Sequence, residues 1–355
     1  MKDLLRIMIF LSVILIVFFY FDSSIEENDL LKAPVTQDPL PADDLVENPL
    51  EVERPREGLS TYIGKSAEQW LDDYGNPSRI EPSAFGYEWW VYNQSYSSYL
   101  MVGVKEEKIV QVYAAGAAAH VAPYTIGQTL DDLYRFTIVE NEITAKYGDS
   151  IFTFNLSPED LDKRLLIRFE EIYAQLYIDE EDRVLEAVRF MDAETLVRHQ
   201  PYDMMFTGDL LPVIKPSSTQ QSSIDAANAT QIVDMTNVYR INHQLSPLTE
   251  NAAASSLAQT HSENTAKKSF SSGQEVELES LNVRLNNAGI GFEEAAENTA
   301  FQYFDAAEAV HGWINSADHR NVLLSDRFGE IGVGVFGKYY TQIMLKPKEE
   351  KTIAE

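Results

Sequence analysis

A short motif occurs twice in the first half of the chain and limits how that half can fold. Ile63-Gly64-Lys65-Ser66 recurs 63 residues later as Ile126-Gly127-Gln128-Thr129. A short helical pattern follows each copy, AEQWLDDYG in the first and LDDLYRF in the second. Ser66 with Gln69 fits a capping box, and Thr129 with Asp132 is a weaker version. The repetition predicts two copies of one structural unit.

The remainder of each copy is predicted to form strands. Residues 87–92 (YEWWVY) match residues 151–156 (IFTFNL). A hairpin pattern then closes each copy, with polar turns at residues 105–108 and 179–183. A helix and strands, present twice, predict one duplicated α+β domain over residues 58–205.

The Gly64-Lys65-Ser66 sequence looks like the end of a phosphate-binding loop, but its context does not fit. Five residues separate Gly58 from Gly64, where the motif requires four, and the second copy has no lysine. A turn followed by a helix cap accounts for both copies. We therefore predict no nucleotide site here.

An uninterrupted apolar run, residues 7–21, lies near the N-terminus. Lys2 and Arg6 precede it and acidic residues follow, so we expect the rest of the chain to lie outside the cell. Counted from Leu4, the stretch has 18 residues, slightly fewer than the about 20 of a typical spanning helix. No small-x-small cleavage site follows. Residues 1–21 are thus predicted to be an uncleaved signal anchor of a single-pass membrane protein. Secretion after cleavage is the alternative.

Two segments are predicted to be linkers. Residues 22–57 contain eleven acidic residues, three basic residues and five prolines, which favour an extended spacer. Residues 206–226 are rich in proline, serine and glutamine. The whole chain has a net charge of −28, which argues against binding to nucleic acid. It has no cysteine, which excludes disulfides, thiolate metal sites and cysteine nucleophiles.

The C-terminal third combines helical and strand patterns. Helices are predicted over residues 227–243, 252–268, 281–287 and 305–315, and strands over residues 331–336 and 339–345. Several ordered motifs fall within this region: 237–240 (NVYR), 245–248 (LSPL), 258–262 (AQTHS), 297–298 (EN), 312–316 (GWINS), 319–323 (HRNVL) and 328–334 (FGEIGVG). Together they resemble the CAP domains of bacteria, a superfamily named for cysteine-rich secretory proteins, antigen 5 and pathogenesis-related 1 proteins.

This resemblance has consequences for the fold. It implies an α-β-α sandwich over residues 227–346, followed by a charged tail at residues 347–355. The duplicated unit resembles the CAP-associated N-terminal domain of Gram-positive bacteria, best over residues 87–92. The expected class is α+β, with the duplicated domain preceding the sandwich. Since the chain has no cysteine, packing alone must hold the sandwich together.

The resemblance also implies a cleft. In many CAP domains two histidines and two acidic residues converge there, and in some members they bind a divalent metal. Glu297 and His319 match two of these positions. The other histidine position falls in residues 270–273 (FSSG) and the second acidic position falls near Ser316, so two ligands are absent. We predict a ligand cleft formed by Glu297, Asn298, Ser316, His319 and Ser272, with no metal and no cofactor.

Two functions of different class remain open. The first is a non-catalytic module of the cell envelope that binds a small molecule, a lipid or a cell-wall component. The second is a hydrolase of envelope peptides or peptidoglycan that uses Glu297 and His319. His261 lies on the apolar face of its helix and is interpreted as a core histidine. His311 would share a helix face with His319 only if one helix continued through Ser316.

Overall fold

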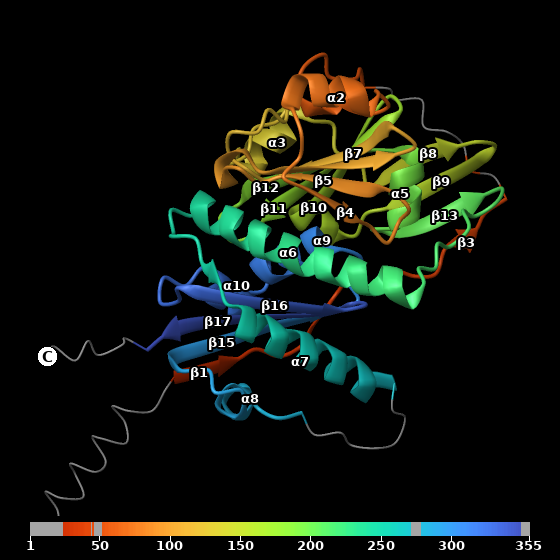
Figure 1. Ribbon diagram of the computed structural model, residues 1–355. Helices are drawn as coiled ribbons and strands as arrows, with labels where there is room; N and C mark the ends of the chain where they lie inside the picture. The colour runs from red at the N-terminus through yellow and green to blue at the C-terminus, as the bar shows by residue number, and fades with distance from the viewer. Residues whose placement is uncertain (1–23, 44, 46–51, 271–277, 349–355) are drawn as a thin grey trace, which may run out of the picture.

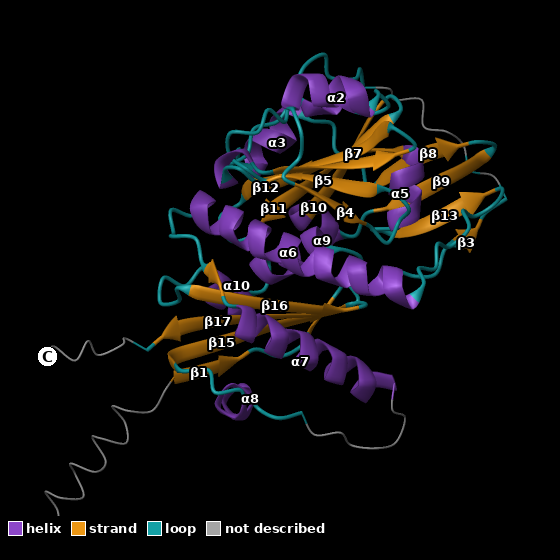
Figure 2. Ribbon diagram, viewed as in Figure 1, coloured by secondary structure: helices purple, strands orange, loops and turns teal. Residues whose placement is uncertain are grey.

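A computed structural model describes residues 24–43, 45, 52–270 and 278–348. The predicted signal anchor lies outside these residues. Within the described part of the chain, no helix has both the length and the apolar character needed to cross a membrane. Figures 1 and 2 show two stacked α/β parts, with the long helix α6 (Ser218–Asn242) running between them.

The N-terminal domain contains a seven-stranded antiparallel sheet with the order β10-β11-β12-β7-β6-β5-β4. The first copy of the repeat contributes η1 (Leu59–Tyr62), α2 (Ala67–Tyr74), β4 (Arg79–Pro82), β5 (Glu88–Tyr92), η2 (Tyr96–Ser98), β6 (Leu100–Lys105) and β7 (Lys108–Ala114). The second contributes α3 (Leu130–Phe136), β8 (Glu142–Tyr147), β9 (Ser150–Asn155), α4 (Pro158–Lys163), β10 (Arg164–Phe169), β11 (Ile172–Asp179) and β12 (Val184–Asp192). The domain ends with α5 (Ala193–His199) and β13 (Asp203–Thr207).

The two copies attach their glycine turns in the same way. The Gly64 amide donates to the Ile109 carbonyl at 2.7 Å, and the Gly127 amide donates to the Leu185 carbonyl at 2.7 Å. Both glycines have φ near +86°, a region that side chains rarely adopt, which explains why glycine stands in both copies. The copies differ in their strands, because the second copy has five, of which β8 and β9 leave the main sheet and join β13 in a separate four-stranded sheet.

The C-terminal domain is an α-β-α sandwich, as predicted. Its sheet has the order β1-β15-β17-β16-β14, with β2 also paired to β15. The strands that lie within this domain's own sequence are β14 (Thr249–Glu250), β15 (Phe292–Phe301), β16 (Glu330–Phe336) and β17 (Tyr339–Pro347). One face is covered by α7 (Ala252–Phe270) and α8 (Leu281–Asn287). The other is covered by α6, α9 (Ala306–Ile314) and α10 (Ala317–Leu323). The sequence patterns located the helices α7, α8 and α9 and the strands β16 and β17, but not β15 or α10.

The glycines of β16 allow α7 to approach the sheet closely. A Cβ atom on Gly334 would lie 1.9 Å from the Gln259 nitrogen, and one on Gly332 would lie 2.3 Å from the Ala254 carbonyl carbon. Only a residue without a side chain fits between this strand and the helix backbone. The alternating residues Val333 and Val335 point to the opposite face and pack in the core.

The prediction of an extended spacer over residues 22–57 is wrong for its first part. Residues 24–33, which we call the strap, form β1 (Ser24–Glu27) and β2 (Leu31–Lys32). Both pair in parallel with β15, at the edge of the C-terminal sheet. A third short strand, β3 (Leu40–Pro41), pairs with β13. Strands added at an edge are held by backbone hydrogen bonds, so an acidic, proline-rich composition does not exclude them.

The second predicted linker, residues 206–226, is also largely ordered. β13 extends to Thr207, and α6 begins at Ser218, nine residues before the predicted start at residue 227. Ser217 and Gln220 form a capping box at its N-terminus. The first turns of α6 are polar because they are solvent-exposed, and such turns carry no apolar periodicity.

The two domains share one apolar core and a set of buried ion pairs. Tyr113 and Tyr177 of the N-terminal sheet belong to the same hydrophobic cluster as Tyr239 of α6 and Trp313 of α9. Arg164 of β10 pairs with Glu308 of α9 at 2.8 Å, and Arg189 of β12 pairs with Asp305 at 2.7 Å. The domains are therefore packed as one body rather than joined by a flexible linker.

Candidate functional site

A cavity of about 580 Å³ lies between the strap, α7 and strands β15 and β17. The strap contributes Glu27, Asn28, Asp29 and Leu30 to its wall. Residues with a hydroxyl group are frequent on the remaining wall: Ser262, Thr265, Ser269, Thr299, Tyr339, Tyr340 and Thr341. Such a wall suits a ligand that exchanges hydrogen bonds with the protein.

Glu297 of β15 lines this cavity and is neutralised there. Its two carboxylate oxygens accept hydrogen bonds from Arg284 of α8, at 2.9 Å to Nη1 and 2.6 Å to Nη2. Both side chains are buried, with 8% of Arg284 and 4% of Glu297 exposed. A carboxylate held in this bidentate pair is positioned to bind and orient, not to transfer a proton.

His261 is part of the same wall, where the sequence analysis interpreted it as a core histidine. Its Nε2 lies 3.7 Å from Glu297 Oε2. Burial lowers the pKa of His261, the Glu297 carboxylate opposes this shift, and the Arg284 guanidinium adds to it. The imidazole is therefore neutral at physiological pH and presents a polar group to the cavity. His261 belongs to the family motif at residues 258–262, and Thr265 follows it by four residues on the same helix face.

His319 lies outside the wall of the cavity, in α10, with both ring nitrogens engaged. Nε2 is 2.9 Å from the Asp29 carbonyl oxygen of the strap, and Nδ1 is 2.8 Å from Ser316 Oγ. A carbonyl can only accept, so Nε2 carries the proton and Nδ1 accepts from the Ser316 hydroxyl. Burial lowers the pKa of His319, which favours this neutral form. The arrangement fastens the strap to α10.

Asn298 also forms a hydrogen bond with the strap and does not line the cavity. Its Nδ2 donates to the His319 carbonyl at 3.0 Å, and its Oδ1 accepts from Asn28 Nδ2 at 2.9 Å. Neighbouring residues of a strand point to opposite faces, so Glu297 faces α7 and α8 while Asn298 faces α10. The four predicted cleft residues that the structure describes, Glu297, Asn298, Ser316 and His319, are thus not gathered in one place. Ser272 lies outside the described residues.

The comparisons with known proteins bear on both halves of the chain. Residues 63–202 match the family model for the CAP-associated N-terminal domain, and residues 233–342 match the model described as the cysteine-rich secretory protein family. The chain is also 33% identical to YlbC of Bacillus subtilis, named an uncharacterized membrane protein. This similarity covers 98% of the chain and 99% of YlbC.

The chain belongs to the cysteine-rich secretory protein, or CAP, family. Two crystal structures support the assignment over both domains. An extracellular protein of Bacillus anthracis that contains an SCP domain is 37% identical and has a TM-score of 0.76, with 85% of this chain and all of that one covered. A cysteine-rich secretory protein of Staphylococcus aureus is 27% identical, with a TM-score of 0.75 and coverage of 90% and 100%.

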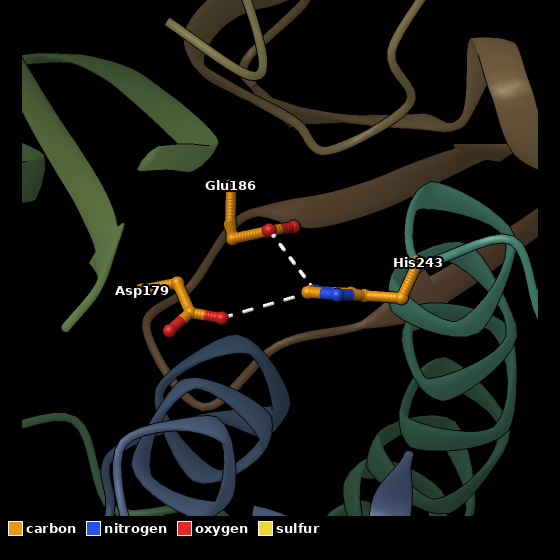
Figure 3. A group of neighbouring side chains, drawn as sticks. All are labelled: Asp179, Glu186 and His243. Carbon is orange, nitrogen blue, oxygen red and sulfur yellow. Dashed lines mark ion pairs between the residues drawn. The ribbon is translucent and has the colours of Figure 1, made fainter. Parts of the chain in front are cut away.

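The described part of the chain contains one group of side chains suited in type to a metal ion, and it lies away from the cavity of the CAP domain. Asp179 and Glu186 of the N-terminal domain face His243 at the end of α6, with their ligand atoms within 4.8 Å of one another (Figure 3). His243 Nε2 lies 3.2 Å from Glu186 Oε1 and 3.8 Å from Asp179 Oδ2.

These groups already have partners from the protein. Arg320 of α10 is ion-paired with Asp179, and the amides of Glu181 and Asp182 donate to the same carboxylate. The Glu186 carboxylate accepts from Asn242 Nδ2 at 3.4 Å. The cluster thus acts as an ion-pair contact between the two domains, in which the Arg320 guanidinium is paired with Asp179 and His243 lies beside Glu186.

Proposed function

We propose that this chain is a membrane-anchored, extracytoplasmic CAP protein that binds a small polar component of the cell envelope without chemically altering it. The observation that carries this proposal is the Arg284–Glu297 ion pair inside a hydroxyl-lined cavity of about 580 Å³. A cavity of this size holds a small ligand, and its hydroxyls match the hydroxyl and amide groups of a glycan or peptide fragment.

The membrane location is supported by two observations. The apolar run at residues 7–21 has a positive flank before it and acidic residues after it. The relative YlbC, which matches nearly the whole chain, is named a membrane protein. Both agree with an anchor that leaves the two domains outside the cell.

Hydrolysis through Glu297 and His319 finds less support in the geometry. Glu297 is paired with Arg284 in the cavity, whereas His319 is bonded to Ser316 and to the strap. A nucleophile, a base and an orienting group must lie within hydrogen-bond reach of each other, and these two side chains face different elements.

The test is binding of cell-wall muropeptides to the full-length chain, measured by native mass spectrometry and titration calorimetry. Thr265→Trp fills the cavity from α7, and we expect it to abolish binding. Thr260→Trp is the matched control, because Thr260 is exposed on the same helix and does not line the cavity. Equal binding by both variants, or turnover of a muropeptide by the unaltered chain, would refute the proposal.

A further inference from the structure

Because of the strap, the domain that the chain enters first after the membrane anchor is not the domain that comes first in the sequence. In the sequence the duplicated domain precedes the CAP domain. In the structure the first described strand, β1, already belongs to the CAP sheet, where Ser24–Glu27 pairs with residues 294–297 of β15. The chain thus enters the CAP domain first, and joins the N-terminal domain only with β3.

Very little chain separates the apolar run from this strand. The run ends at Phe21 and β1 begins at Ser24. Three residues of extended chain span at most about 11 Å. With an uncleaved anchor, the beginning of β1 is held within that distance of the bilayer.

The strand directions identify which end of the molecule is held there. β1 and β15 are parallel and begin at this end, while β17 is antiparallel and finishes there, with Phe292 opposite Pro347. Figure 1 shows α2 at the top of the molecule, beyond the seven-stranded sheet and on the far side of it from the CAP domain. Trp70 of α2 packs on the outer face of the seven-stranded sheet, and the CAP helices α6 and α9 pack on its inner face.

The charges near the beginning of β1 are compatible with a lipid surface. Arg327 pairs with Glu26 at 3.1 Å and with Glu294 at 3.2 Å. Lys346 pairs with Glu293 at 3.2 Å and with Glu294 at 3.3 Å. The two cations pair with three carboxylates and leave this group a formal charge of −1, in a chain whose net charge is −28, which limits the local repulsion from anionic headgroups.

We propose that the end of the CAP sheet at which β1 begins rests on the phospholipid bilayer, and that α2 of the duplicated domain lies away from it. The CAP domain is then the membrane-proximal domain although it comes last in the sequence. The proposal requires the membrane anchor but not ligand binding, so the two can fail separately.

The absence of cysteine allows a direct test on the full-length chain in vesicles of phosphatidylcholine and phosphatidylglycerol. Single-cysteine variants Lys348→Cys, beside the end of β17, and Glu68→Cys, on α2, are labelled with a fluorophore. Both positions are exposed. Lipids with a nitroxide headgroup should remove most of the emission at position 348 and leave that at position 68 unchanged.

A longer tether provides the control. A Gly/Ser insertion of about 20 residues after Asp22 spans about 25 Å on average and should restore most of the emission at position 348. The proposal would be overturned by equal quenching at both positions or by stronger quenching at position 68. It would also be overturned if the insertion did not reduce the quenching at position 348. An intact mass that lacks the first 21 residues would do the same.

Discussion

Arg284 of α8 and Glu297 of β15 form a bidentate ion pair at 2.6 and 2.9 Å, buried in the wall of the cavity. A buried pair is costly to desolvate but much more costly to break, because the remaining charge has no partner. The pair therefore holds α8 against the sheet. It also neutralises the charge of the Glu297 carboxylate in the cavity wall.

We expect Arg284→Met to lower the free energy of unfolding by about 3–5 kcal/mol, since it leaves the Glu297 carboxylate buried without its cation. The double variant Arg284→Met/Glu297→Leu should regain most of this loss. Lys346→Met is the control, because Lys346 pairs with Glu293 and Glu294 at a site with 42% of its side chain exposed; it should cost less than about 1 kcal/mol. Urea unfolding measures all three, and additive effects of the two cavity substitutions would contradict the expectation.

The ion-pair cluster between the domains should make stability depend on pH through His243. Its interaction with the Glu186 carboxylate raises the pKa of His243, against the effect of burial. A raised pKa in the folded state means that the stabilisation is fully present below about pH 6.5, the unfolded value. It is lost as the pH rises through the raised pKa. The free energy of unfolding of the unaltered protein should therefore exceed that of His243→Gln by more at pH 6 than at pH 8.

His311 provides a control of opposite sign for this measurement. Burial lowers its pKa to about 4. Its stabilisation is therefore present above about pH 6.5 and is lost as the pH falls toward 4. In a series of urea unfolding curves, His311→Gln should reduce the loss of stability in acid. Identical pH profiles for the unaltered protein and His243→Gln would show that the cluster does not titrate with folding.

The elements predicted correctly are those with local signals. The helices at α7, α8 and α9 have apolar periodicity and turn residues, and the break at Gly337 and Lys338 separates the strands β16 and β17. The repeat pointed to equivalent turns, and the structure shows Gly64 and Gly127 bonded alike. Within the candidate site, Glu297 was identified through the family motif and does line the cavity.

The elements that were missed depend on distant partners. Ser24 of the strap contacts Glu294, 270 positions away, and its pairing uses backbone groups that composition does not report. Arg284 was not predicted as a site residue, because a salt bridge from α8 to β15 leaves no periodic signal in the sequence. His319 was assigned to the cleft by its motif, but its ring is bonded to a carbonyl of the strap, a segment predicted to be a spacer.

The close contact between α7 and β16 should make Gly334 intolerant of any side chain. Gly334→Ala would place a Cβ 1.9 Å from the Gln259 nitrogen of the helix backbone, which must move. We expect a loss of about 1–3 kcal/mol or more in unfolding free energy, measured by chemical denaturation. Gly329→Ala is the matched control, because its nearest contact would be Pro347 Cδ at 4.0 Å. Equal effects of the two substitutions would argue against the contact.

A substitution of Asn28 should weaken the attachment of the strap to the CAP domain. Its amide nitrogen donates to the Glu297 carbonyl at 3.1 Å, and its side chain donates to Asn298 Oδ1 and to the Asp318 carbonyl. Asn28→Pro removes all three hydrogen bonds, each worth about 0.5–1.5 kcal/mol. Hydrogen exchange of the strap should therefore accelerate by roughly ten- to a thousandfold. Val35→Pro, at a position with 86% of its surface exposed, should leave exchange unchanged.

Because Asn28 and Asp29 also line the cavity, Asn28→Pro should in addition weaken ligand binding. Faster exchange with unaltered binding would separate the strap's structural role from the cavity.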